Sequence, residues 1–162
     1  MNLSVTGHQP PLLGGFTPEV DIKLFNLPLT WLLPQQSVNK VISGLAPGWD
    51  WAVARAAKQL GIPLVAALSH SKQGHNWPIE AKQQLDDLLT YATVHIHDGV
   101  FKNQGQHIKD RWKERDHWVV DHGDVVLALW NGQTEGGAAN AVRYALSEGK
   151  QVINLWDDWC KL

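Results

Sequence analysis

The sequence has very little cysteine and no long apolar run. Its single cysteine, Cys160, permits no internal disulfide and no cysteine-based metal site. No stretch reaches the roughly 18 consecutive apolar residues that a membrane helix needs, and the first residues lack the basic and apolar regions of a secretory signal. We therefore expect a cytoplasmic protein without membrane association.

Net charge is also low. The formal charge is −2 and the isoelectric point is near 6.4, so the chain lacks the basic character that bulk nucleic-acid binding requires. No repeat, low-complexity tract or linker divides the 162 residues, which predicts a single domain over 1–162. Nine tryptophans are present, and we assign most of them to a core or an interface because Trp buries a large apolar area.

The stretch from 124 to 155 has the clearest pattern. Residues 124–130 form a nearly continuous apolar run, typical of a strand buried on both faces of a parallel sheet. The pair Gly136-Gly137 follows, and from Ala138 apolar residues recur at three- and four-residue spacing, which indicates a helix. Residues 151–155 then predict another strand, so the stretch reads as a βαβ unit with a glycine loop before its helix.

The same alternation runs through the whole chain. Pro28 should kink or split the first helix, and Asp50 is placed as the N-cap of the second. The polar stretch 98–106 is predicted to be mobile. The alternation predicts an α/β fold with a Rossmann-like, doubly wound, mostly parallel sheet of about six strands and helices on both faces. Strands are predicted at 3–5, 38–43, 63–68, 93–96, 124–130 and 151–155, and helices at 18–33, 51–60, 77–91, 108–121 and 138–148.

Three of the predicted strands are followed directly by glycine-bearing loops. They run from Gly7 to Gly15, from Gly44 to Gly48 and from Gly132 to Gly137. Each alone is compatible with an ordinary tight turn, but the carboxyl ends of parallel strands share one edge, so the three loops should converge. Glycine lets an anion approach the unpaired N–H groups of a helix N-terminus, so convergence favours a phosphate or nucleotide pocket. Neither GxGxxG nor GxxxxGK[ST] occurs, so neither dinucleotide nor P-loop chemistry is indicated.

Several polar side chains accompany these loops. His8 can donate to a phosphate or act in acid–base chemistry, and Asn140 and Arg143 add donors in the first two turns of the last long helix. Glu135 is either a general base or a solvated loop charge. Ser43 is read as a hydrogen-bond donor, because no GxSxG motif marks it as a nucleophile.

Eight histidines raise the question of a metal site. His95 and His97 should face the same side of a strand, but the sequence has no HExxH or similar ligand spacing. Solvated or singly hydrogen-bonded histidines are therefore the favoured interpretation, and we predict no metal.

Three blocks that cover most of the chain match a known pattern in the right order. They are VTGHQPPLLGGF, VISGLAPGWDWAVARAAKQLGIPLVAAL and KERDHWVVDHGDVVLALWNGQTEGGAANAVRYALSEGKQVINL. The corresponding patterns are VTGHRP…LGGY, SGMA.G.D..AA..A..LGIPL.AA and RN.WMVD..D.LIAVWDG…GGTANTVRYA…GK.VI. The sequence thus resembles the SLOG superfamily, the Rossmann-like group named after DNA-processing protein A and the Lonely Guy proteins. Its small single-domain YspA/YoqJ-like branch, common in bacteria and their phages, is the most similar branch.

The resemblance implies a SLOG-like nucleotide-binding domain, and a link to bacterial or phage defence. Its ligand would be a nucleotide or a nucleotide-derived small molecule. No further cofactor is expected, nucleic acid is not favoured, and a homo-oligomer is expected. Together with the glycine loops, the resemblance predicts ligand contacts from Gly7, His8, Gln9, Gly14, Gly15, Ser43, Gly44, Leu45, Ala46, Asp50, Arg115, Asn131, Gly132, Gly136, Gly137, Asn140 and Arg143.

The sequence departs from the family pattern at three positions near the expected site. Gln9 stands where the group often has Arg, Asp116 replaces a usual Asn, and Ala138 replaces the Thr of GGTAN. These changes remove a cation and a hydroxyl and add a negative charge. They point to a less highly charged ligand or to an altered pocket.

We predict a protein that binds a nucleotide or nucleotide derivative, and thereby senses or sequesters a nucleotide signal. Trp49, Trp77 or Trp130 would stack on the base. One alternative is an N-glycosidase or phosphoribohydrolase acting on nucleotides, with Glu135, His8 or Asp50 in acid–base roles. The PGGxGTxxE motif of the Lonely Guy enzymes reads EGGAANAVRYA here, without the glutamate at its usual place. A second alternative is a single-stranded DNA-binding accessory protein, against which the net charge argues.

Overall fold

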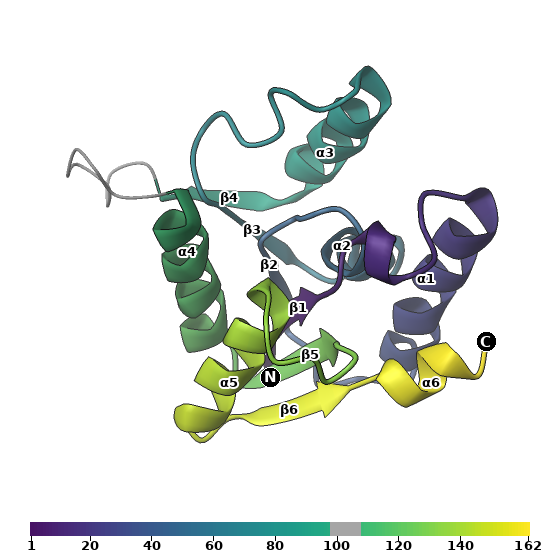
Figure 1. The fold of residues 1–162 in the computed structure, drawn as a ribbon. Coiled ribbons are helices and arrows are strands. Elements are labelled where there is room, and N and C mark those ends of the chain that lie inside the picture. The colour runs from purple at the N-terminus through teal and green to yellow at the C-terminus, as the bar shows by residue number, and fades with distance from the viewer. Residues whose placement is uncertain (98–107) are drawn as a thin grey trace.

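A sheet of six parallel strands forms the centre of the fold, in a computed structural model that describes residues 1–97 and 108–162 (Figure 1). The strands are β1 (Asn2–Gly7), β2 (Lys40–Ser43), β3 (Leu64–Leu68), β4 (Thr93–Ile96), β5 (Val125–Leu129) and β6 (Gln151–Asn154). Their order across the sheet is β4-β3-β2-β1-β5-β6, and every neighbouring pair is parallel. The predicted α/β fold is confirmed. The segment 98–106, which the sequence predicts to be mobile, lies outside the described residues.

Helices cover both faces of this sheet (Figure 1). They are α1 (Pro18–Leu32), α2 (Trp49–Gln59), α3 (Ile79–Tyr91), α4 (Ile108–His122), α5 (Gly137–Ser147) and α6 (Trp156–Cys160), with a short 3₁₀ helix η1 (Pro10–Leu12). On one face α2 packs on β1, β2 and β3, and α1 packs on α2 and α6. On the other face α4 and α5 pack together against β1. The sheet is therefore doubly wound, as the alternation predicts. None of the helices in the described ranges has the length and apolar character needed to cross a membrane.

The two faces of β1 show how the core is divided. Leu3 and Val5 join the larger apolar cluster under α1 and α2, whereas Ser4 points to the other face. There the Ser4 hydroxyl donates to the carbonyl of Val119 in α4 at 2.6 Å. One of two smaller apolar clusters includes Val126 and Ala141, and such small residues allow α5 to pack closely on the sheet.

Three local expectations differ from the structure. Helix α1 runs through Pro28 without a break, because Leu24, Pro28 and Leu32 form one buried stripe whose packing offsets the lost backbone hydrogen bond. Helix α2 begins two residues earlier than expected, so Gly48 is its N-cap and Asp50 lies in its first turn. Helix α6 was not predicted, since five residues are too few to show helical spacing.

Candidate functional site

A cavity of about 790 Å³ opens at the carboxyl edge of the sheet. It lies beside the junction of β1 and β5, where the strand order reverses, which is the usual ligand position in doubly wound sheets. All three glycine loops that the sequence predicts to converge reach this cavity. Its lining includes Gly7, His8 and Gln9 after β1, Ala46 and Asp50 after β2, Gln73 and Trp77 after β3, Gly136 and Gly137 after β5, and Trp112, Arg115 and Asp116 from α4.

A second cavity of about 310 Å³ adjoins the first between α4 and α5. Trp112, Asp116, Gly136 and Gly137 line both cavities. The first turn of α5 therefore separates the two spaces, and Asp116 stands opposite it.

The amino end of α5 presents backbone N–H groups to these cavities. Its N-cap is Gly136, with φ of +105°, and no side chain makes a capping hydrogen bond there. The first N–H groups of a helix have no partner within the helix and carry a partial positive charge. Only glycine adopts this φ without strain, so residue 136 keeps the approach to the helix end open.

Arg115 is the central polar residue of the wall, and only 7% of it is exposed. Its Nη1 donates to the carbonyl oxygens of Gly44 at 2.9 Å and Ala67 at 3.3 Å, and to Gln73 Oε1 at 3.4 Å. Its Nε donates to Asp116 Oδ1 at 2.8 Å. Arg115 thus ties α4 to the loop after β2, to β3 and to the loop after β3. Its Nε and Nη1 therefore position the wall of the cavity.

Two carboxyl groups flank this guanidinium. Asp50 is 8% exposed, and its Oδ2 accepts the N–H of Ala46 at 3.3 Å. Burial raises the pKa of Asp50 to about 7, and the nearby Arg115 charge opposes part of that rise. Burial also raises the pKa of Asp116, again opposed by Arg115. Near neutral pH the cavity wall therefore contains a carboxyl group that can either give up or accept a proton.

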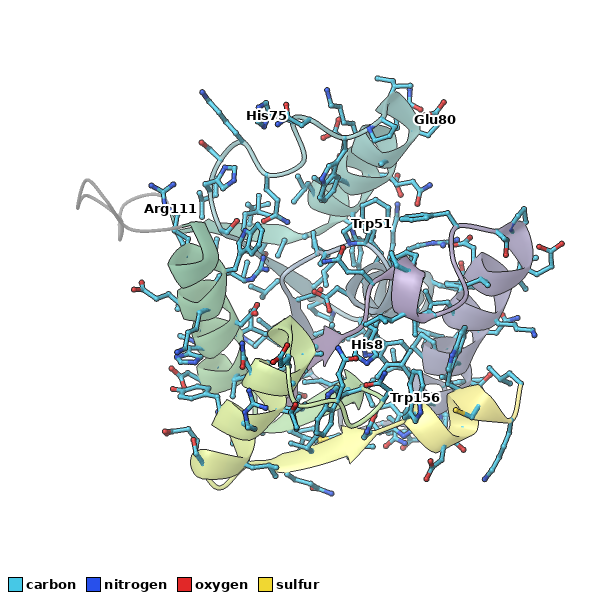
Figure 2. All side chains as sticks on the ribbon, in the orientation of Figure 1. His8, Trp51, His75, Glu80, Arg111 and Trp156 are labelled. Atoms are coloured by element: carbon cyan, nitrogen blue, oxygen red, sulfur yellow. The ribbon has the colours of Figure 1, made fainter. Side chains whose placement is uncertain are left out.

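His8 joins two of the loops at this edge. Its side chain is buried, with the ring edge against Trp156 at a centroid distance of 5.7 Å (Figure 2). Its Nε2 accepts the backbone N–H of Asn131 at 3.0 Å, and the backbone N–H of His8 donates to the carbonyl of Leu129 at 3.0 Å. Burial lowers the pKa of His8, which favours the neutral ring that this acceptor role needs. His8 holds the β1 and β5 loops together.

The predicted contact residues separate into two groups. The larger cavity is lined by Gly7, His8, Gln9, Ala46, Asp50, Arg115, Gly136 and Gly137. The smaller cavity is lined by Asn140, together with Gly136 and Gly137. The remaining candidates line neither cavity. They are Gly14, Gly15, Ser43, Gly44, Leu45, Asn131, Gly132, Arg143 and the catalytic candidate Glu135.

Local contacts explain several of these placements. Leu45 has φ of +55° and is fully buried, and its carbonyl accepts Trp51 Nε1 at 2.7 Å. Arg143 donates to the carbonyl of Thr134 and to Asn140 Oδ1, so it braces the β5–α5 loop.

Of the three tryptophans proposed to stack on a base, Trp77 lines the larger cavity, whereas Trp49 and Trp130 line neither of these two cavities. Trp49 is fully buried against Gly7 and donates to the carbonyl of Leu127 at 3.3 Å, so the proposed stacking by Trp49 is wrong. Trp130 Nε1 instead donates to the carbonyl of Gln133 at 3.0 Å.

Sequence reasoning missed Trp112 and Gln73. Trp112 is exposed and lines both cavities, three residues before Arg115 and four before Asp116. Residues at this spacing share a helix face, so the presence of Arg115 in α4 was a signal that could have identified Trp112. Gln73 lies in a loop without periodicity, and no comparable signal exists for it.

The histidines of β4 pack on an aromatic residue. The ring of His95 stacks on Trp118 at 4.3 Å, and His97 contacts the same indole edge-on at 5.3 Å, so both face one side as predicted. Within the two described ranges, no three His, Cys, Asp or Glu side chains are grouped in a way that could hold a metal ion.

The fold and the cavity place this chain among the Rossmann-like α/β proteins. DNA processing protein A from Streptococcus pneumoniae superposes with a TM-score of 0.66 at 17% identity, over 94% of this chain and 49% of that one. The structural genomics target TM1055 superposes with a TM-score of 0.57 at 18% identity, over 93% of this chain and 71% of that one. The chain thus has a SLOG-type fold and spans about half the length of the first of these proteins. Its sequence matches no family model and no curated protein.

Proposed function

We propose that this protein binds a nucleotide or nucleotide-derived small molecule in the larger cavity. The observation that carries the proposal is the meeting of the glycine loops and α4 around about 790 Å³ at the strand-order reversal. That volume lies within the roughly 300–1,000 Å³ typical of small-molecule sites.

Each part of a nucleotide has a matching group in the wall. The free amides at the start of α5 suit a phosphate, because a helix N-terminus is a natural anion site. The carboxyl groups of Asp50 and Asp116 accept hydrogens from hydroxyl or amino groups. The indoles of Trp112 and Trp77 offer flat faces to a base. Binding without turnover would let the protein sense or sequester a nucleotide signal.

Thermal-shift screening against nucleosides, nucleoside monophosphates and dinucleotides tests this function, since a ligand of the folded state raises the melting temperature. In Gly136→Glu the shift should disappear while the fold remains, because the new carboxylate occupies the approach to α5. Gly132→Glu is the matched control: Gly132 has φ of +88° in the same loop but lines neither cavity. An undiminished shift in Gly136→Glu would refute the site.

One observation favours a second function, hydrolysis of a nucleotide N-glycosidic bond. Asp50, with a pKa of about 7, can protonate the leaving base while Asp116 activates a water molecule. Chromatography for free base after incubation with nucleoside monophosphates tests this reaction, and Asp50→Asn should abolish release. Glu135 lies outside both cavities and His8 Nε2 already accepts an N–H, so neither is our choice for the acid. If no free base is released, hydrolysis is refuted and the binding function stands by itself.

Single-stranded DNA belongs in the same binding panel, because the name of one structural relative refers to DNA processing. The net charge of −2 predicts no binding at moderate salt, since affinity for DNA depends on neutralising phosphates with Lys and Arg. We also propose that the ligand needs no additional cofactor.

A further inference from the structure

Asp116 lies at the boundary of the two cavities, opposite the first turn of α5. Its Oδ1 accepts the Arg115 Nε hydrogen at 2.8 Å. Its Oδ2 lies 4.0 Å from the position that a Cβ on Gly137 would occupy. The side chain is 28% exposed, so this second oxygen is directed at the space in front of α5 and is open to a ligand.

This carboxylate is held in place. Arg115 is buried, and its other contacts are to the Gly44 and Ala67 carbonyls and to Gln73. Because these contacts fix the guanidinium, Asp116 cannot turn away without losing its charge-assisted hydrogen bond. Burial raises the pKa of Asp116, and the ion pair with Arg115 opposes that rise and favours the charged form, which keeps the negative charge beside the amino end of α5.

The fixed charge of Asp116 disfavours a dianion at that point, although Lys113 also lines the smaller cavity. Arg115 is the ion-pair partner of Asp116, so the two charges largely offset each other, and its Nε and Nη1 donate to protein oxygens. A phosphomonoester carries about −1.5 to −2 near pH 7, because its second pKa is about 6. A phosphodiester carries a single negative charge. Like charges repel more strongly in a partly buried site than in water.

From this geometry we propose, resting on the proposed function above, that Asp116 is a specificity-determining residue. Its carboxylate accepts a hydroxyl or N–H hydrogen of the ligand and disfavours a phosphomonoester dianion beside α5. The cavity thus selects nucleosides and phosphodiester-linked nucleotides over nucleoside monophosphates.

Calorimetric titration tests the selection with three probes for each of the four bases at pH 7.5: the nucleoside, its 5′-monophosphate and its 3′,5′-linked dinucleoside monophosphate. In the wild-type protein the monophosphate should bind more weakly than the diester. Asp116→Asn keeps an oxygen for the Arg115 Nε hydrogen and removes the charge, so it should shift the ratio of the two dissociation constants about tenfold toward the monophosphate. Asp116→Glu retains the charge and should retain the preference for the diester.

Glu148→Gln is the matched control. It makes the same change of net charge at the opposite end of α5, where Glu148 is the C-cap, and should leave the ratio unchanged. If wild-type protein prefers the monophosphate, or if Asp116→Asn leaves the ratio unchanged, the role of Asp116 is refuted while the nucleotide site stands. If no probe binds the wild-type protein, both proposals fail.

Discussion

Residues 7 and 44 must be glycine because other side chains pack directly against them. A Cβ on Gly7 would lie 2.4 Å from Trp49 Cδ1, and a Cβ on Gly44 would lie 2.7 Å from Arg115 Cζ. The sequence predicts both glycines as contacts for a ligand. At Gly44 the space is instead taken by the arginine that organises the cavity wall, a distinction that depends on three-dimensional packing.

Gly44→Ala should destabilise the protein by roughly 1–3 kcal/mol, because the displaced guanidinium loses buried hydrogen bonds. Urea denaturation measures the change. In an Arg115→Ala background the same substitution should cost less, since the side chain that it displaces is gone. Equal costs in both backgrounds would show that the two residues are not coupled.

Asp50 should make stability depend on pH. Burial raises its pKa from 3.8 to about 7 in the folded protein, so between these values the folded state holds a proton that the unfolded chain releases. The free energy of unfolding therefore falls as the pH rises through this range and levels off above it. Asp50→Asn keeps an acceptor for the Ala46 N–H and should remove much of this fall, on the order of a few kcal/mol.

Denaturation of both proteins at pH 5 and pH 8 checks this dependence. Asp157→Asn, at an exposed position in α6, is the control and should leave the profile as it is. An unchanged profile in Asp50→Asn would contradict the argument.

Among the secondary-structure elements, α4 connects the cavity to the opposite end of the sheet. One face of its middle turns carries Arg115 and Asp116 toward the cavity. At its carboxyl end Lys150 Nζ donates to the carbonyls of Val120 at 2.5 Å, Asp121 at 3.0 Å and Gly123 at 2.6 Å. A cation at this end of a helix satisfies unpaired carbonyls and complements the helix dipole.

Lys150→Met should destabilise the protein by about 1–3 kcal/mol, because three carbonyl groups lose a charged donor while the apolar stem is kept. Thermal and urea denaturation measure the loss. Lys161→Met, at an exposed position near the end of the chain, is the control and should change stability by less than about 0.5 kcal/mol. Similar losses in the two variants would rule out a specific role for Lys150.

The elements with strong periodicity were predictable, and so was the convergence of their loops. Parallel strands of continuous apolar residues fix which edge the glycine loops must reach, so topology alone located the cavity. The features that the sequence did not predict depend on contacts between residues far apart in the sequence. The partners of Arg115 are two backbone carbonyls and Gln73, and their positions follow from the sheet rather than from any motif. Helix α1 continues through Pro28 for a similar reason, since buried packing outweighs local propensity.

At the scale of the whole molecule, the sheet has two edge strands of different character. All four residues of β4 are exposed, including Val94 and Ile96. On β6, at the other edge, Gln151 and Asn154 are exposed and the two apolar residues between them are only half-buried. An exposed edge with apolar side chains favours pairing between chains.

The predicted homo-oligomer therefore has a candidate contact surface at β4. Light scattering should give a mass above the 18.1 kDa of one chain, and Val94→Lys should lower it, because charged side chains on an edge strand oppose pairing. Gln151→Lys places the same charge on β6 and should not alter the mass. A mass of 18.1 kDa at every concentration would refute the prediction.

The position of β1 in the middle of the sheet sets an order of events during synthesis. Gly7 pairs with Leu129, so the first strand of this sheet to leave the ribosome gains one of its two neighbours only after the residues up to β5 have followed. At roughly 5–20 residues per second, that interval lasts on the order of 10 seconds. During it the nascent chain can pair β1 with β2 and β2 with β3, but it exposes the flank of β1 that later receives β5. Chaperone contact or mispairing on the ribosome should therefore concentrate at that flank, and truncation before residue 125 should leave four of the six strands as an aggregation-prone partial sheet.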